Sequence, residues 1–240
     1  MFWSFCSAKG GVGTSTLAAA TAIELARTTS VLLVDLAGDQ PDLLGVTAGS
    51  HGIMDWLRAD ADVGPEALAN LVVPVIRAAG ATTPGRLELV PRGSHGSNVD
   101  PVSMVAAPRV AALQPGLSPL ADVIIADLGV LDGNGFDTTA LIAAAADRVS
   151  LVVRACYIGL RRAQRVGVAV DDVVEVVDGG RALGTLDIEA VLEQPVTARL
   201  NVDPSIARAV DAGLMVTRLP RPLRRTARHL LDDSTRTSAA

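Results

Sequence analysis

The sequence has little lysine, few aromatic residues and few cysteines. Only one of its 21 Lys and Arg residues is a lysine, and aromatic residues make up 2% of the 240 positions. Cys6 and Cys156 are too few for a disulfide framework, so we expect free thiols in a reducing compartment. No signal-peptide pattern and no apolar run long enough to span a membrane is present, which predicts a cytoplasmic protein.

Composition also limits what the chain can bind and how its core is built. A net charge of -5 excludes a protein whose whole surface attracts nucleic acid, although a local basic patch remains compatible with it. The three histidines lack ligand spacing with any cysteine or histidine, so we expect no zinc site. At 49% hydrophobic content with few aromatics, the chain can bury one large core of Val, Leu, Ile and Ala.

Short apolar runs alternate with stretches of helical spacing along the whole chain. Continuous apolar strands separated by helices are typical of a mainly parallel sheet flanked by helices on both faces, an α/β fold. We expect a single domain over residues 1–231 and a disordered tail over 232–240. The expected strands are residues 2–6, 31–34, 87–90, 123–126, 149–153, 173–177 and 196–200, and the first helix is 14–27.

The single lysine, Lys9, lies in a glycine-rich loop between the first strand and the first helix. Glycines allow backbone N–H groups to turn inward around an anion, and the helix N-terminus adds its dipole at the same point, so the segment predicts a polyphosphate site. Ser15 is placed to bind Mg²⁺ and Thr16 to reach a phosphate oxygen. The alternative is a glycine turn with no ligand. The expected nucleotide-binding residues are Lys9, Gly10, Gly11, Val12, Gly13, Thr14, Ser15 and Thr16.

Two strands end in aspartates that we expect at the carboxyl edge of the sheet. Asp35 follows the strand at 31–34, and Asp127 follows 123–126. Ligands of open α/β sheets bind at that edge, so both are candidate site residues, with Asp127 ordering Mg²⁺ through water. Asp35 has an alternative role in capping the next turn. Asp39 is the weaker candidate, because two more extended residues would carry its carboxylate past the site.

The loop at residues 6–16 resembles the deviant Walker A loop of the ParA/MinD superfamily of P-loop ATPases. The resemblance implies that Lys9 is the signature lysine, which reaches the phosphates of a partner subunit in a nucleotide-sandwich homodimer. It also implies ATP and Mg²⁺ as ligands and catalytic roles for Lys9, Asp35 and Asp127. Two family residues are replaced: Thr14 stands at the ordinary P-loop lysine, and Ala37 stands at a second switch aspartate that positions water.

The loop is most similar to the CpaE/TadZ branch, which implies a nucleotide-dependent switch that positions a pilus or secretion assembly. With Thr14 and Ala37 at those positions, two groups that organise the phosphoryl-transfer transition state are absent, so we expect slow hydrolysis. Two alternatives stay open: a catalytically inactive scaffold that has kept the fold, and a DNA-partition ATPase that binds DNA nonspecifically.

A basic amphipathic segment over residues 219–231 offers a docking surface. Such a segment suits the inner face of a membrane or contact with DNA phosphates. The stronger expectation is a last helix that packs on the sheet and leaves its basic side in solvent. A second cluster, Arg161, Arg162 and Arg165, has the same alternatives. The basic residues of the C-terminal segment are Arg221, Arg224, Arg225 and Arg228.

Overall fold

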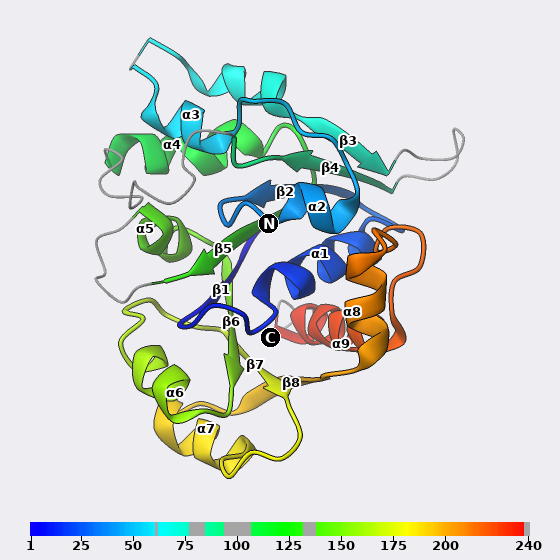
Figure 1. Ribbon diagram of the computed structural model, residues 1–240. Helices are drawn as coiled ribbons and strands as arrows, with labels where there is room; N and C mark the ends of the chain where they lie inside the picture. Colours follow the sequence, from blue (N-terminus) through cyan, green and yellow to red (C-terminus); the bar gives the residue numbers. More distant parts are fainter. Residues whose placement is uncertain (61, 77–84, 94–106, 132–137, 238–240) are drawn as a thin grey trace.

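One eight-stranded sheet forms the centre of the protein (Figure 1). The computed structural model describes residues 1–60, 62–76, 85–93, 107–131 and 138–237. The strands follow the order β3-β4-β2-β5-β1-β6-β7-β8 across the sheet. They are β1 (Phe2–Ser7), β2 (Ser30–Asp35), β3 (Val73–Ile76), β4 (Arg86–Val90), β5 (Val123–Val130), β6 (Arg148–Arg154), β7 (Asp172–Val177) and β8 (Val196–Asn201).

Every strand pair is parallel except β3 with β4, where β3 closes one edge of the sheet in the antiparallel sense. The helices, which include one 3-10 helix, η1, provide the crossovers that parallel neighbours require. They are α1 (Thr14–Leu25), α2 (Gln40–Leu44), α3 (Ile53–Arg58), η1 (Pro65–Leu71), α4 (Ala107–Leu117), α5 (Thr138–Ala144), α6 (Tyr157–Ala163), α7 (Thr185–Leu192), α8 (Pro204–Asp211) and α9 (Arg221–Thr237).

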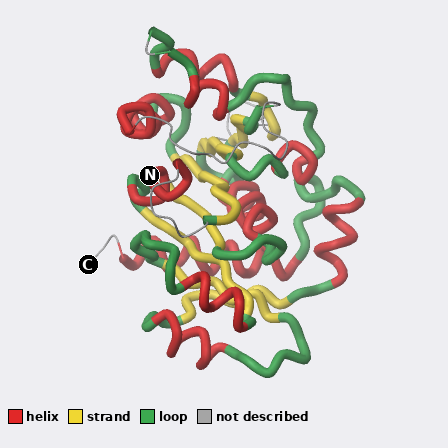
Figure 2. Tube along the Cα trace, turned by 60° about the vertical axis from the view of Figure 1, so that its left-hand side comes forward, coloured by secondary structure: helices red, strands yellow, loops and turns green. Residues whose placement is uncertain are grey.

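The strands are apolar on both sides because helices cover both faces of the sheet. Along β2, Leu32 and Val34 join one buried cluster, whereas Val31 and Leu33 join the other. Successive strand residues point to opposite faces, so a continuous apolar run contributes side chains to both buried clusters. Helices α3 to α7 supply the first cluster, and α1, α8 and α9 supply the second. Figure 2, turned by 60°, shows helices on both sides of the strands.

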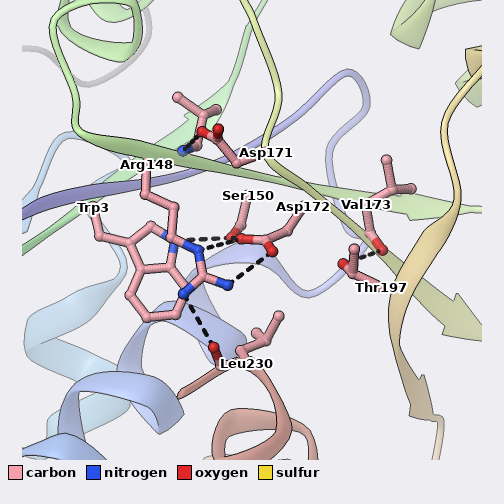
Figure 3. Close-up of polar contacts among 9 residues, drawn as sticks. Trp3, Arg148, Ser150, Asp171, Asp172, Val173, Thr197 and Leu230 are labelled. Carbon is pink, nitrogen blue, oxygen red and sulfur yellow. Dashed lines mark hydrogen bonds and ion pairs between the residues drawn. The ribbon is translucent and has the colours of Figure 1, made fainter. Parts of the chain in front are cut away.

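Helix α9 is fixed to the amino edge of the sheet by a buried polar network (Figure 3). Arg148 donates to both carboxylate oxygens of Asp172, at 2.7 and 2.8 Å, and to the backbone oxygen of Leu230 at 3.0 Å. Its guanidinium also lies 4.1 Å from the ring centroid of Trp3. Ser150 accepts a hydrogen bond from Trp3 Nε1 and donates one to Asp172. Residues far apart in the sequence are therefore joined where β1, β6, β7 and α9 meet.

The fold confirms the expected α/β architecture of a mainly parallel sheet with helices on both faces, and the expected strands and first helix are all present. The C-terminal boundary is different: α9 continues past residue 231 to Thr237, so residues 232–237 are helical rather than a disordered tail. Residues 238–240 lie outside the described residues. None of the described helices is both long and apolar enough to cross a membrane.

Candidate functional site

The glycine-rich loop between β1 and α1 leaves open space around its backbone. Gly11 and Gly13 have φ angles of 72° and 98°, in the region that glycine adopts without strain. A Cβ atom built on either residue would meet no atom within 4 Å. Gly13 is also the N-cap of α1, and no side chain caps this helix end. The first N–H groups of α1 and the loop amides therefore remain available to an anion.

Three side chains of the loop occupy different environments. Thr14 is 5% exposed, and its hydroxyl has no hydrogen-bond partner among the described residues. Ser15 is half-buried, and its hydroxyl lies 3.4 Å from a carboxylate oxygen of Asp39. Thr16 is half-buried on the same helical turn. A buried hydroxyl without a partner is costly, so the unpartnered Thr14 hydroxyl fits a site completed by a polar ligand.

Lys9 reaches across to the start of α6 rather than to an acidic residue. Its Nζ lies 3.8 Å from Cys156 Sγ, and a Cβ on Gly159 would be 4.0 Å from Lys9 Cδ. Within the described ranges, no carboxylate lies within ion-pair distance of this ammonium. The charge of Lys9 therefore has no internal counterion there and remains available to phosphate oxygens.

Asp35 and Asp127 lie side by side toward the carboxyl ends of β2 and β5, as predicted, but β5 continues past Asp127 to Val130 instead of ending at residue 126. They are register partners on the parallel strands β2 and β5, and both are fully buried. Asp35 accepts hydrogen bonds from the backbone N–H of Gly38 at 2.6 Å and of Gln40 at 3.1 Å. Asp127 accepts one from the N–H of Gly129 at 3.2 Å. Among the residues that the structure describes, neither carboxylate has an arginine or lysine within ion-pair distance.

The environment of these two aspartates favours their neutral forms in the absence of a cation. Burial raises the pKa of Asp35 to about 7, and the nearby charge of Asp127 acts in the same direction against the two backbone hydrogen bonds. Burial also raises the pKa of Asp127, while the hydrogen bond from Gln40 opposes the shift. Buried carboxylates with a raised pKa are typical of functional sites, and a bound cation would favour their charged forms.

Asp39 lies closer to the loop than the sequence analysis expected. The expectation of an extended chain after Asp35 is wrong, because Gly38 turns the backbone with a φ of 102° and Asp39 has helical backbone angles before α2. The exposed Asp39 carboxylate therefore returns to the hydroxyl of Ser15. Ala37, in contrast, places its Cβ beside Gly129, 3.1 Å from where a Cβ on that glycine would lie.

Gln40 is a site residue that the sequence analysis did not identify. It is fully buried, and its amide nitrogen donates to Asp127 at 2.8 Å and to the backbone oxygen of Ser15 at 3.0 Å. Its Oε1 has no partner in the described part of the chain. Gln40 thus joins the glycine loop, the segment after β2 and strand β5. The only signal in the sequence is its position, five residues after Asp35.

The donor set fits Mg²⁺ carried by a nucleotide. Over the described ranges, no group of three or more His, Cys, Asp or Glu side chains could hold a metal ion by itself. Mg²⁺ is commonly bound by one or two protein groups together with substrate phosphates and water. Ser15 and Asp127, with Asp39 beside them, supply oxygen ligands of that kind next to an open anion cradle.

The arginines of α9 lie on a different part of the protein. Its apolar residues Leu223, Ala227 and Leu230 are fully buried, so this side of the helix packs inside the protein as the packing alternative expected. Arg228 and Arg224 approach the buried Glu24 of α1, at 2.6 and 3.8 Å. The outer side forms a hollow of about 410 Å³, lined by Arg221, Arg224, Arg225, Arg228, His229 and Asp232.

No protein-family model and no curated protein matches this chain. Solved structures match it over nearly its whole length. A ParA family ATPase from Chlorobium tepidum is 21% identical with a TM-score of 0.70, covering 94% of this chain and 95% of that one. A chain of the MinC:MinD cell division protein complex from Aquifex aeolicus is 22% identical with a TM-score of 0.69, covering 96% of each.

A third match carries a nucleotide. The septum site-determining protein MinD from Pyrococcus horikoshii, complexed with Mg-ADP, is 17% identical with a TM-score of 0.71, covering 99% of this chain and 96% of that one. At these identities the likeness concerns the fold. The chain therefore has the fold of the ParA- and MinD-type P-loop ATPases.

Proposed function

We propose that this protein is an ATP- and Mg²⁺-binding switch of the ParA/MinD superfamily. The observation that carries the proposal is the open loop around Gly11 and Gly13 next to two buried carboxylates, Asp35 and Asp127, that have no lysine or arginine within ion-pair distance in the described ranges. Backbone amides and Lys9 bind the phosphates, while Ser15 and Asp127 hold Mg²⁺, the latter through water. Bound Mg²⁺ supplies positive charge at the phosphate oxygens.

The switch acts through a homodimer that forms face to face across the two glycine loops. Gly10 and Gly11 are exposed, and the neighbouring Val130 side chain is 44% exposed. Small, exposed and apolar groups around the loop suit close contact with a second copy. In such a dimer Lys9 reaches the partner's nucleotide, and the segments after Asp35 and Asp127 respond to the γ-phosphate.

Turnover is slow in this proposal. The chain has Thr14 in place of one lysine and Ala37 in place of one aspartate, and each lost transition-state contact costs about 10²-fold in rate. Asp39, which lies beside Ser15, partly replaces the missing carboxylate.

The protein positions a cellular assembly, with the CpaE/TadZ pilus and secretion machinery as the nearest model. The rival is a scaffold that binds nucleotide and dimerises without hydrolysis.

Light scattering with ATP, ADP and no nucleotide, each with Mg²⁺, tests the switch. We expect a monomer without nucleotide and a dimer of twice the mass with ATP. Lys9→Ala should remain monomeric with ATP, whereas Arg86→Ala, a surface ion-pair variant remote from the loop, should dimerise normally. Phosphate release that exceeds background and is lost in Lys9→Ala separates the slow enzyme from the scaffold. A mass that is the same in all three conditions would exclude the switch.

A DNA-partition function is the second candidate, supported by the arginine-lined hollow on α9. With its apolar side buried, α9 offers charge rather than apolar surface to a ligand, which favours phosphate contacts over insertion into a bilayer. ATP-dependent retention on duplex DNA that weakens steeply with salt and is lost in Arg221→Glu/Arg225→Glu would support it. Retention that is unchanged in this double variant would exclude it.

A further inference from the structure

Helix α6 carries an exposed surface that the nucleotide site does not use. Leu160 and Ala163 on one side of the helix are buried in the core, and the following Val166 is buried as well. The opposite side is exposed, with Tyr157 at 66% and Ile158 at 56%. We call the exposed residues the α6 surface: Tyr157, Ile158, Arg161, Arg162 and Arg165, the last in the turn after the helix.

The α6 surface combines apolar and positively charged groups without any acidic residue. Arg161 donates to the Tyr157 hydroxyl at 3.0 Å, and its guanidinium lies 5.7 Å from the ring centroid. Arg162 and Arg165 are exposed beside this pair. Tyrosine and arginine are the residue types that most often dominate binding energy at protein interfaces. Three arginines in nine residues also stand out in a chain whose net charge is -5.

We propose that the α6 surface docks an acidic segment of a partner protein that carries an aromatic or aliphatic anchor residue. Charge complementarity selects this occupant: carboxylates meet Arg161, Arg162 and Arg165, and the apolar anchor packs on Tyr157 and Ile158. A second copy of the chain suits it less well. A symmetric contact would place the same three arginines opposite one another, and facing like charges are unfavourable.

Helix α6, which carries the α6 surface, contacts Lys9 of the glycine loop. Cys156, the N-cap of α6, lies 3.8 Å from Lys9 Nζ, and Gly159 on the first turn approaches the same lysine. A ligand that moves Lys9 therefore acts on the start of α6, and a peptide on α6 acts on Lys9. Such coupling is reciprocal: ATP and the acidic segment must change each other's affinity by the same factor. This part of the inference rests on the proposed function.

Selection from a library of random twelve-residue peptides against the full-length protein tests the docking surface without nucleotide. We expect the selected peptides to be rich in Asp and Glu with at least one aromatic or aliphatic residue. The acidic bias should disappear or reverse to Lys and Arg on Arg162→Glu/Arg165→Glu, and the apolar anchor should be lost on Tyr157→Ser. Selected peptides without an acidic excess, or the same excess on the charge-reversal variant, would overturn the proposal.

A matched charge reversal controls for net charge. Helices α8 and α6 lie on opposite sides of the protein (Figure 1). Arg208 on α8 and Arg218 in the segment after it are exposed, so Arg208→Glu/Arg218→Glu should keep the acidic preference. Loss of the preference in this control would also overturn the proposal. Thermal unfolding of each variant identifies any that do not fold.

The coupling is measured with the most enriched acidic peptide by fluorescence anisotropy, with and without Mg-ATP. We expect the peptide Kd to change at least threefold, and the ATP Kd measured by calorimetry to change by the same factor when peptide is saturating. If the peptide Kd is the same with and without Mg-ATP, peptide binding and ATP binding are not coupled. Because the selection needs no nucleotide and the charge reversals lie outside the glycine loop, failure of ATP binding and failure of peptide docking are distinguishable.

Discussion

Buried carboxylates at the two edges of the sheet have different hydrogen-bond donors. At the amino edge, Asp172 is 5% exposed and receives two hydrogen bonds from the guanidinium of Arg148 (Figure 3). At the carboxyl edge, Asp35 and Asp127 are fully buried, and in the described ranges only uncharged groups donate to them. A buried carboxylate that is paired with its own cation is costly to separate from it, whereas buried carboxylates with a raised pKa are typical of functional sites.

The largest expected effect comes from removing the cation at the amino edge. Arg148→Ala leaves Asp172 buried and unpaired and frees the end of α9, so the free energy of unfolding should fall by about 3–5 kcal/mol. Urea denaturation measures the change. Arg86→Ala, which breaks the exposed pair with Glu88, should cost less than about 1 kcal/mol. If both variants lose the same free energy of unfolding, the Arg148 network contributes no more to stability than an exposed ion pair.

The next effect concerns the pH dependence of stability at the carboxyl edge. The pKa of Asp35 is raised to about 7 in the folded protein from an ordinary value of 3.8, so the native state binds the proton more tightly. Stability without nucleotide should therefore fall as pH rises from about 4 to 7, by ~2–4 kcal/mol. Asp35→Asn should flatten this decrease and raise stability at pH 8.

Thermal or urea unfolding at several pH values between 4 and 8 provides the measurement. Asp122→Asn is the matched control, since Asp122 precedes β5 at the opposite edge of the sheet and should leave the decrease intact. The same pH dependence in wild type and Asp35→Asn would contradict the raised pKa of Asp35. Saturating Mg-ATP should reduce the pH dependence, because bound cations favour the ionised carboxylates.

A smaller effect tests Asp39, whose carboxylate lies 3.4 Å from the Ser15 hydroxyl. Asp39→Ala should weaken the enhancement of ATP affinity by Mg²⁺ by about tenfold, or ~1.4 kcal/mol. Asp42→Ala removes an exposed carboxylate from the adjacent helix α2 and should leave the enhancement unchanged. Calorimetric titrations with Mg²⁺ and with EDTA give both affinities. If the two variants behave alike, Asp39 has no part in holding the metal.

The smallest effect compares the two thiols. Cys6 is fully buried, and burial raises its pKa to about 12, so it should not react in the folded protein. Cys156 is half-buried beside Lys9 and should take up a single iodoacetamide. Mg-ATP should slow this alkylation severalfold by holding Lys9 and the start of α6. Mass spectrometry identifies the labelled site, and labelling of Cys6 at the same rate would contradict the burial of β1.

The sequence was sufficient for the strands and for the loop, because both depend on local pattern. The apolar runs before Asp35 and Asp127 have the length of strands, and parallel strands bring their carboxyl ends to one edge. Asp39 was misplaced because the turn at Gly38 follows from a backbone angle that composition alone does not specify. Gln40 was missed because a glutamine after a turn has no distinctive spacing.

The network at the amino edge could not be predicted at all. Trp3 and Ser150 are separated by 147 positions, and Arg148 and Leu230 by 82. No local signal joins them, and each has an ordinary role where it stands, so their contacts depend on the tertiary arrangement. The sequence also did not show that one side of α6 is exposed, because an arginine cluster is compatible with both a solvent-exposed and a packed side of a helix.

Calorimetric titration of the protein with ATP in the presence of Mg²⁺ tests the central claim most directly. The open glycine loop, the Lys9 ammonium and the two buried aspartates predict saturable binding of one ATP per chain, weakened when Mg²⁺ is removed. An absence of any binding heat, together with an unchanged unfolding temperature at saturating ATP, would contradict the claim that this edge of the sheet is a nucleotide site.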